Sequence, residues 1–401
     1  MSQFARERAA VAEICARVLA EGDEALHDLG RQFDGWAPAA GESFEVPIRE
    51  LAAAADRLPP GDRAALEFAA QRIRDFHERQ APAASVGSPG LKLVTRPVRR
   101  AGVYAPGGRA AYPSTVLMTV IPARVAKVPE VVLATPPRPD GTVPSPILAA
   151  AHIAGVDSVY RVGGAQAIAA LAYGTASIPR VDVVAGPGNI YVTLAKREVF
   201  GSVGVDGIAG PTEVVVVADA QARPDFVAAD LAAQLEHDPL AWGVLVTDSS
   251  RLADRVEEEL ESLLHGLDRA EIIRQANCCV IIADDMDQAM HVANDFAPEH
   301  LLIVAGDAAR LAAQVENAGA VFVGPYATVP LGDYAAGPNH TLPTSGAARF
   351  SSPLGVHTFL KRSSVLSLNR GDLETLRDAS VRLAEMEGLG AHAHAIEVRL
   401  E

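Results

Sequence analysis

The sequence contains few cysteines, and none of them is spaced for a cross-link or a metal cluster. Cys15, Cys278 and Cys279 are the cysteines of the 401 residues, and no CxxC spacing occurs. This pattern excludes a disulfide framework and a thiolate zinc cluster. Residues 278 and 279 are adjacent in a predicted strand, so their side chains point to opposite faces. We interpret all three as small buried apolar residues.

Signals for membranes and for nucleic acids are also lacking. No stretch is long and apolar enough to span a bilayer, and residues 1–8 contain no apolar signal core. The formal net charge is −15 and no basic patch stands out, which argues against nucleic-acid binding. We therefore expect a reducing, cytoplasmic location, with no membrane and no nucleic-acid partner.

The sequence does contain the composition and the alternating pattern of strands and helices that are typical of a large α/β protein. Hydrophobic residues make up 49% and charged residues 21%, and the length predicts two or three domains. Residues 4–33 and 48–80 have helical periodicity. From residue 91 on, short apolar runs alternate with helical patterns, which is typical of parallel, doubly wound sheets.

The predicted fold class is α/β, with two Rossmann-like doubly wound domains, one inserted in the other, and a small C-terminal helical segment. The first domain is predicted to comprise residues 1–103 and 212–354. Residues 104–211 form the inserted domain, and residues 355–401 form the tail.

The stretch from Asn294 to Leu302 is the strongest candidate for the chemistry. Pro298 disfavours helix at the residue before it, so the chain turns there, and the apolar run that follows predicts a buried strand. Glu299 and His300 therefore lie at the mouth of a strand. An imidazole takes a proton near neutral pH, and a partly buried carboxylate can do the same or activate a water. A solvent-facing pair is the alternative interpretation.

Three polar clusters supply candidate metal ligands. Gln234 and His237 share one face at a helix end, Asp333 and His340 lie in a loop of small residues, and His392 lies beside glycines in the tail. Gln234, His237, Asp333 and His392 form an N/O set that suits catalytic zinc, although manganese or cobalt could also occupy it. A capped helix end, an Asp-initiated turn and a frayed tail are the alternatives.

Three Gly-rich turns, at residues 102–108, 163–166 and 186–189, each follow a predicted strand and precede a predicted helix. Backbone amides at such helix starts bind phosphate. None of the turns matches G-x-G-x-x-G, so spacing alone identifies no dinucleotide, and ordinary tight turns are the alternative.

Together these residues resemble the histidinol dehydrogenase family through nearly the whole chain. The stretches that carry the resemblance include Gly-Val-Tyr-Ala-Pro-Gly-Gly, Gly-Gly-Ala-Gln-Ala-Ile-Ala, Ala-Gly-Pro-Gly-Asn, Gly-Pro-Thr-Glu-Val, Gln-x-Glu-His-Asp-Pro, Ala-Pro-Glu-His-Leu and Gly-Asp-Tyr-x-x-Gly-Pro-Asn-His. The family oxidises L-histidinol to L-histidine through an aldehyde, the last step of histidine biosynthesis. It passes two hydrides to two NAD molecules in turn.

The resemblance implies roles for individual residues. His300 matches the base that removes the alcohol proton, and Glu299 matches the residue that activates water to hydrate the bound aldehyde. One zinc ion per subunit would anchor the substrate through Gln234, His237, Asp333 and His392. The other matches are NAD contacts at Tyr104, Gln166 and Asn189, substrate contacts at Thr212 and Glu387 alongside His300 and the metal ligands, and a further active-site histidine at His340.

The resemblance also implies an assembly. In the family the tail crosses to the other subunit of a homodimer, so Glu387 and His392 would complete the partner's site, while residues 104–211 would bind NAD. The family usually has an N-terminal arm ahead of the first helix, and this chain starts near that helix. Thr212 stands where Ser is commoner, which keeps a hydroxyl.

Two alternatives remain at this stage. One is a paralogue that oxidises another alcohol, and the other is a non-catalytic two-domain binder of small molecules. Three features favour the histidinol branch: the His-Asp-Pro run that follows Glu236, the residue His340 and the residue Glu387. The intact Glu299–His300 pair argues against a non-catalytic binder.

Overall fold

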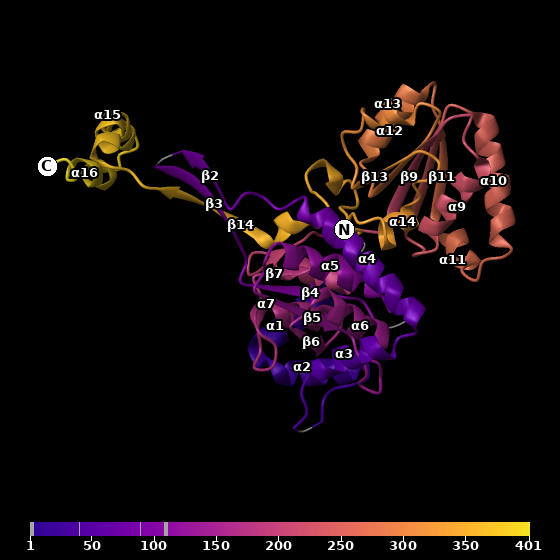
Figure 1. Ribbon diagram of the computed structural model, residues 1–401, viewed down its shortest axis with the longest axis horizontal. Helices are drawn as coiled ribbons and strands as arrows, with labels where there is room; N and C mark the ends of the chain where they lie inside the picture. The colour runs from indigo at the N-terminus through magenta and orange to yellow at the C-terminus, as the bar shows by residue number, and fades with distance from the viewer. Residues whose placement is uncertain (1–3, 40, 89, 108–110) are drawn as a thin grey trace. The chain divides into compact units, whose positions relative to one another are not determined.

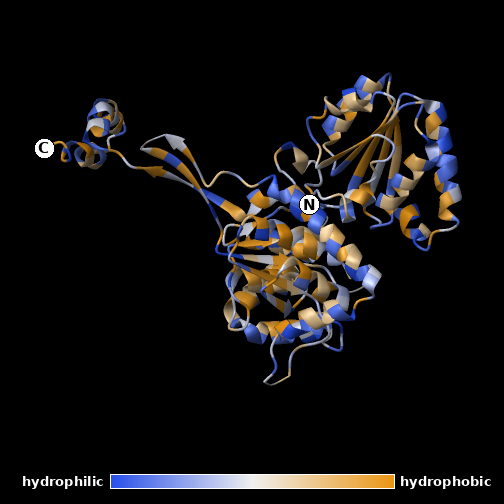
Figure 2. Cartoon of the chain, viewed as in Figure 1, coloured by the Kyte–Doolittle hydropathy of each residue, from blue (hydrophilic) through white to orange (hydrophobic). Residues whose placement is uncertain are grey.

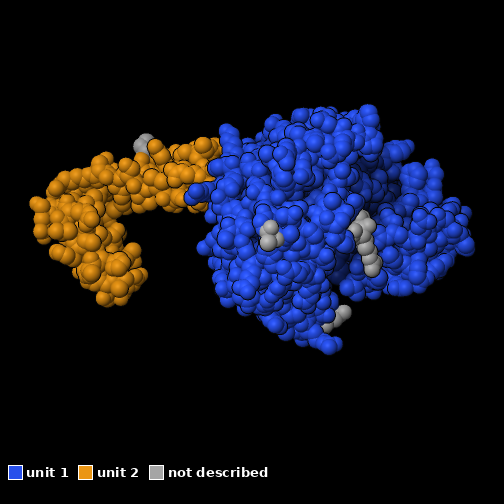
Figure 3. Space-filling model, turned by 90° about the horizontal axis from the view of Figure 1, so that it is seen from below, with its two compact units in different colours: residues 1–81, 98–359 blue, residues 82–97, 360–401 orange. Residues whose placement is uncertain are grey.

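The structure is a computed structural model that describes residues 4–39, 41–88, 90–107 and 111–401. The chain divides into two compact units, residues 1–81 with 98–359 and residues 82–97 with 360–401 (Figures 1 and 3). Of the Gly-rich turn at 102–108, Gly108 lies outside the described residues. In the described ranges, no helix has the length and apolar character needed to cross a membrane.

The first sheet of the larger unit is parallel except at one edge. Its strand order is β1-β6-β5-β4-β7-β8, and only the pairing of β1 with β6 is antiparallel among the described strands. Every residue of β7 and all but the first of β5 are buried, as expected for a sheet covered on both faces. The strands are β1 (Glu45–Val46), β4 (Arg100–Tyr104), β5 (Glu130–Thr135), β6 (Ser158–Arg161), β7 (Val183–Ala185) and β8 (Gly204–Val205).

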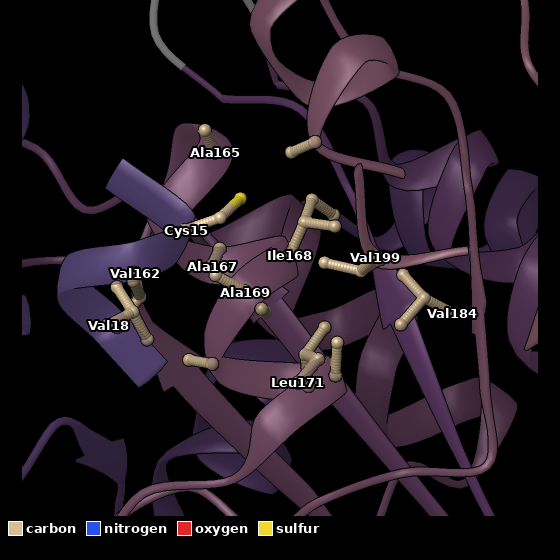
Figure 4. Close-up of a cluster of buried hydrophobic side chains, with 14 of the residues drawn as sticks. Cys15, Val18, Val162, Ala165, Ala167, Ile168, Ala169, Leu171, Val184 and Val199 are labelled. Carbon is tan, nitrogen blue, oxygen red and sulfur yellow. The ribbon is translucent and has the colours of Figure 1, made fainter. Parts of the chain in front are cut away.

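Helices pack in two groups around this sheet. One group brings α1 against α7 and α8, and the other brings α3 and α4 against α6 and α5. Figure 4 shows the apolar core of the first group, where Cys15, Ile168 and Leu171 lie among small side chains. The helices are α1 (Ala5–Glu21), α2 (Asp23–Leu29), the π-helical turn η2 (Gly30–Asp34), α3 (Ile48–Arg57), α4 (Pro60–Glu78), α5 (Pro113–Val125), α6 (Ser145–Ala154), α7 (Gly164–Tyr173) and α8 (Ile190–Val199).

The N-terminal helices therefore pack differently from the expected domain division. The sequence prediction grouped residues 1–103 with residues 212–354. In the structure, α1, α3 and α4 pack on helices of the first sheet, and β4 pairs with β5 and β7 inside that sheet. Helical periodicity shows that a helix buries one face, but it does not show which sheet covers that face.

The second sheet of the larger unit is fully parallel, with the order β11-β10-β9-β12-β13. Alternate residues of the central strand β9 pack against opposite helix layers, α9 and α10 on one face and α12 and α13 on the other. Figure 2 shows that the strands of this sheet are mostly hydrophobic. The elements are β9 (Glu213–Ala218), α9 (Pro224–Leu235), β10 (Trp242–Thr247), α10 (Ser250–Leu264), α11 (Ala270–Gln275), β11 (Asn277–Ile282), α12 (Met286–Phe296), β12 (His300–Val304), α13 (Ala308–Ala312), β13 (Ala320–Val323) and α14 (Val329–Tyr334).

The cysteine interpretation holds for one of the three residues. Cys15 is buried, Cys279 is half-buried, and Cys278 is exposed. The reason is the position of β11, which lies at the edge of the second sheet and alternates half-buried with exposed residues. A strand at an edge leaves part of one face uncovered, so the prediction of burial was wrong for Cys278.

The smaller unit consists of an antiparallel sheet, β2-β3-β14, and two helices. Among its described residues, the buried apolar side chains are those of Ala384 and Ala393. Its large apolar side chains are mostly exposed, including Leu366, Leu383 and Met386. The elements are β2 (Ser85–Ser88), β3 (Leu91–Pro97), β14 (Leu360–Leu366), α15 (Arg370–Met386) and α16 (Gly390–Glu397), and two short 3-10 turns, η3 (Ala347–Arg349) and η4 (Val356–Phe359), precede β14 in the chain.

Candidate active site

The predicted Glu299–His300 pair lies at the amino end of β12. Helix α12 ends at Ala297, which adopts a left-handed conformation with φ 54°, and His300 opens the strand after Pro298 and Glu299. A non-glycine residue in this conformation costs about 1 kcal/mol. The turn predicted from Pro298 is confirmed, and both polar side chains are buried.

His300 is held so that one ring nitrogen is free. Its Nδ1 lies 3.2 Å from the carbonyl oxygen of Glu213, the first residue of β9. A carbonyl only accepts hydrogen bonds, so the contact assigns the ring proton to Nδ1 and leaves the lone pair on Nε2. Nε2 is buried and has no hydrogen-bond partner among the described residues. Burial lowers the pKa of His300, which keeps the ring neutral and able to accept a proton.

Glu299 is fixed by two hydrogen bonds to one carboxylate oxygen. Thr212 Oγ1 donates to Oε2 at 2.5 Å, and the backbone N–H of Glu213 donates to the same oxygen at 3.0 Å. Burial raises the pKa of Glu299 to about 7, although both bonds favour the charged form. Its Oε2 lies 3.6 Å from His300 Nδ1, so two groups that can exchange protons near neutral pH are neighbours.

Gln234 lies in the last turn of α9, and His237 follows the end of that helix by two residues. Gln234 is buried, and its Nε2 donates to Thr212 Oγ1, while its Oε1 has no hydrogen-bond partner among the described residues. His237 comes just after the helix and is solvent-accessible. Partial desolvation lowers the pKa of His237, and so does the nearby His300.

Asp333, near the end of α14, lies close to His300. Its Oδ1 lies 4.0 Å from His300 Nε2. Burial raises the pKa of Asp333 to about 6, against the opposing effect of His300. Asp333, Glu299 and His300 therefore form one electrostatic cluster.

Gln234, His237 and Asp333 have the chemical groups that bind a metal cation. A buried acceptor without a partner costs about 1–3 kcal/mol, and a metal ion at Gln234 Oε1 would satisfy it. The neutral His237 ring and the Asp333 carboxylate are ordinary zinc ligands. No group of three or more His, Cys, Asp or Glu side chains arranged for a metal occurs in the described ranges. The ligand set implied by the family resemblance includes the amide of Gln234, which is not one of these four residue types. Its fourth member, His392, belongs to the smaller unit.

His340 connects Asp333, which follows the second sheet, with helix α5, which packs on the first sheet. Its Nδ1 lies 2.9 Å from the carbonyl oxygen of Asp333, and its Nε2 lies 3.5 Å from Thr115 Oγ1 in α5. The pKa of His340 is lowered to about 4, mainly by burial and to a smaller extent by His300 and His237, so the ring is neutral. His340 therefore fixes the backbone that carries Asp333.

The residues matched to NAD contacts lie after the carboxyl ends of strands in the first sheet. Tyr104 ends β4, Gln166 lies in the first turn of α7 after β6, and Asn189 caps α8 after β7 (Figure 1). Dinucleotides bind at this end of open parallel sheets. The Gly164 N–H donates to Tyr104 Oη at 3.1 Å, and Gln166 Nε2 donates to Asp34 Oδ2 at 3.2 Å.

Glu387 and His392 lie in the smaller unit and are both exposed. Glu387 caps the C-terminal end of α15, and His392 lies in the first turn of α16. The larger unit therefore contains Gln234, His237, Asp333, Glu299 and His300, without the tail residues.

Sequence reasoning missed Glu213. Its backbone N–H and C=O hold Glu299 and His300, and its Oε1 accepts a bond from the Ser345 N–H. The pKa of Glu213 is raised to about 7, mainly by burial and to a smaller extent by the nearby Glu299. A carboxylate that opens an otherwise apolar, fully buried strand was the available signal.

The fold defines a class, the α/β proteins built on two largely parallel sheets. An acetylating aldehyde dehydrogenase from Geobacillus thermoglucosidasius has a similar fold, with a TM-score of 0.50 over 91% of this chain and 92% of that chain. At 14% identity the likeness is one of fold alone.

The chain belongs to the histidinol dehydrogenase family. The family's sequence profile matches residues 2–400. Histidinol dehydrogenase from Parasynechococcus marenigrum is 48% identical over 96% of this chain and 90% of its own length. The one from Aquifex aeolicus is 49% identical over 97% and 91%. A crystal structure of histidinol dehydrogenase from Elizabethkingia anophelis has a TM-score of 0.92 at 34% identity, covering 98% of this chain and 92% of that chain.

The chain is therefore an NAD-dependent oxidoreductase of histidine biosynthesis, and the predicted family is confirmed. The predicted α/β fold class is confirmed as well.

Proposed function

We propose that the chain oxidises L-histidinol to L-histidine through L-histidinaldehyde, at the site formed by Glu299, His300 and the candidate metal ligands. The observation that carries the proposal is the free, buried Nε2 of His300, which lies 4.0 Å from Asp333 Oδ1. A neutral imidazole with its other nitrogen bonded to a carbonyl is a base ready to take a proton.

Each of the two catalytic residues has one task. His300 Nε2 takes the hydroxyl proton of the alcohol, and NAD, when bound, accepts the hydride that leaves with it. Glu299 then takes a proton from the water that adds to the aldehyde. His300 returns its proton to the aldehyde oxygen as the water adds, and it then takes a hydroxyl proton of the resulting hydrate in the second oxidation. Thr212 holds Glu299 in place and is itself held by Gln234.

Zinc is proposed as the resident metal, one ion per subunit, held by Gln234, His237, Asp333 and His392. It would anchor the substrate at these residues as a Lewis acid and would not itself be oxidised or reduced. The unpaired Gln234 Oε1 supports this assignment, as does the ligand set, which contains no sulfur. The substrate contacts are proposed at these same residues and at Thr212, His300 and Glu387. NAD contacts are proposed at Tyr104, Gln166 and Asn189.

A homodimer is proposed as the functional assembly, because the smaller unit cannot bury its own apolar residues. Leu366, Leu383 and Met386 are exposed in the isolated chain, with Met386 at 77%. An apolar surface of this kind marks an interface. In a dimer the tail of one subunit would supply Glu387 and His392 to its partner's site. A cytoplasmic location is part of the same proposal.

The test is the NADH yield per L-histidinol consumed by zinc-loaded protein. A yield of about two is expected, because the alcohol and the hydrated aldehyde each release one hydride. A yield of about one would show that the aldehyde escapes without hydration, and would contradict the role of Glu299. No NADH at all would contradict the substrate, and turnover of another alcohol in a panel would then identify the paralogue.

The second oxidation is expected to depend on pH through Glu299. The carboxylate form activates water, and the pKa of Glu299 is raised to about 7. The rate with L-histidinaldehyde should therefore rise about tenfold per pH unit below 7 and level off above about pH 8. Glu299→Gln should abolish this limb and lower the rate about 10²–10⁴-fold.

The control for that profile is Glu316→Gln, which changes an exposed carboxylate in the same lobe. It should reproduce the wild-type curve. A flat wild-type profile between about pH 5.5 and 8 would exclude Glu299 as the titrating base.

A further inference from the structure

A buried ion pair lies beneath the Gly-rich turn that follows β7, and the proposed mechanism does not use it. Lys196 Nζ lies 2.5 Å from Asp206 Oδ1, and the two side chains are only 5% and 2% exposed. Lys196 comes from α8 and Asp206 follows β8 directly. The other described ion pairs between Arg or Lys and a carboxylate are much more exposed, the least exposed arginine being 20% accessible.

Both members of the pair bind the backbone of Gly186. Lys196 Nζ donates to the Gly186 carbonyl oxygen at 2.6 Å, and the Gly186 N–H donates to Asp206 Oδ2 at 2.7 Å. The two polar groups of one glycine are thus clamped by opposite charges. Charge-assisted bonds of this kind are about twice as strong as neutral ones.

The clamped glycine lies directly against Tyr104. Gly186 has φ 118°, a conformation that L-residues rarely adopt, and a Cβ there would collide with the carbonyl oxygen of Tyr104. The Tyr104 hydroxyl in turn accepts the Gly164 N–H at the start of α7. Tyr104 belongs to the Gly-rich turn at 102–108, so its side chain and backbone join all three candidate NAD turns.

The far end of the turn is fixed by the helix that carries Lys196. Asn189 Oδ1 accepts the N–H groups of Tyr191 and Val192, which caps α8. Lys196 lies seven residues further along this helix and reaches back to Gly186. The turn at 186–189 is thereby held at its first residue by the ion pair and at its last by the cap.

Stability does not by itself explain such a pair. Removing two charges from water is costly, and well-packed apolar residues often replace a buried ion pair without loss of stability. What apolar residues cannot supply is a donor for the Gly186 carbonyl together with an acceptor for its N–H.

We propose that Lys196 and Asp206 are positioning residues for the dinucleotide, since they hold the turn at 186–189 against Tyr104 in the conformation that binds NAD. This inference rests on the proposed function, in which Tyr104 and Asn189 contact NAD. Neither residue of the pair is catalytic, because each acts through Gly186.

The test is the double variant Lys196→Met/Asp206→Asn, which removes both charges and leaves no buried ion unpaired. NAD binding is measured directly by titration of the zinc-loaded protein, and KM values are measured for both substrates. We expect the Kd and KM for NAD to rise about tenfold or more, from the loss of a charged hydrogen bond. The KM for histidinol and the melting temperature should stay near their wild-type values.

The chain contains a matched control at the opposite end of the same sheet. Arg124 binds Asp157 and donates to the Gly155 carbonyl oxygen, while Asp157 accepts the Val131 N–H. This ion pair also binds two backbone groups, but it is more exposed than Lys196–Asp206 and lies away from the candidate NAD turns. Arg124→Met/Asp157→Asn should leave NAD binding unchanged. An equal loss of NAD affinity in both double variants would show a general effect on the sheet and would overturn the proposal.

Two further outcomes are decisive. Wild-type affinity for NAD in the Lys196/Asp206 double variant would overturn the inference, whereas a wild-type protein that does not bind NAD would overturn the proposed function instead. If the Met/Asn variant does not fold, Lys196→Gln/Asp206→Asn retains hydrogen-bonding groups at both positions. It should weaken NAD binding about threefold, and an unchanged Kd would then reject the positioning role.

Discussion

His300→Ala is expected to slow hydride transfer from L-histidinol by about 10²–10⁴-fold, while zinc content stays at the wild-type level. The imidazole supplies a buried base nitrogen without a hydrogen-bond partner, in a ring that lies beside Glu299 and Asp333. It makes no contribution to the proposed ligand set. The measurement is single-turnover NADH formation together with metal analysis of the same sample.

His291→Ala is the control for this prediction. His291 is an exposed histidine of α12, nine residues before His300 in the same lobe. It should turn over like the wild type. If His300→Ala retained turnover within about tenfold of wild type, another group would have to be the base.

His237→Ala is expected to lose zinc and activity together. His237 is a proposed direct ligand, so the loss of metal affinity should exceed the roughly 10–100-fold typical of residues that only support a ligand. The adjacent Gln234 Oε1 would again have no partner. The measurement is zinc content after dialysis against a mild chelator, followed by turnover with and without added zinc.

His265→Ala is the matched surface control, since His265 follows α10 and is exposed. It should keep both zinc and turnover. Comparing the two active-site variants separates the roles: His300→Ala should keep the metal without turnover, and His237→Ala should lose both. A His237→Ala protein that is fully metallated and active would remove this residue from the ligand set.

The sequence predicted the elements where a local signal was strong. Helix α12 ends at Phe296, before the turn at Ala297 and Pro298, and the apolar run after Glu299 forms the buried strand β12. Alternating apolar runs and helical patterns gave the correct fold class. In each case the signal lies in adjacent residues: a proline restricts the residue before it, and a strand buried on both faces is a continuous apolar run.

Other features depend on partners that are distant in the sequence. Glu213 became visible as a structural link only when β9 and β12 were paired, because its backbone groups serve residues 86 and 87 positions away. The sequence did not predict the sheet formed by β2, β3 and β14. Its strands are largely exposed, so they lack the periodicity that predicts a strand.

Placing the proposed base and the candidate NAD turns on different sheets makes the molecule modular. Glu299 and His300 depend on β9 and β12, whereas Tyr104 and Asn189 depend on β4 and α8. Substitutions that change coenzyme preference can therefore accumulate in one lobe without disturbing the hydrogen bonds of the other. Directed evolution toward a different coenzyme could randomise the turns of the first sheet and leave the second sheet untouched.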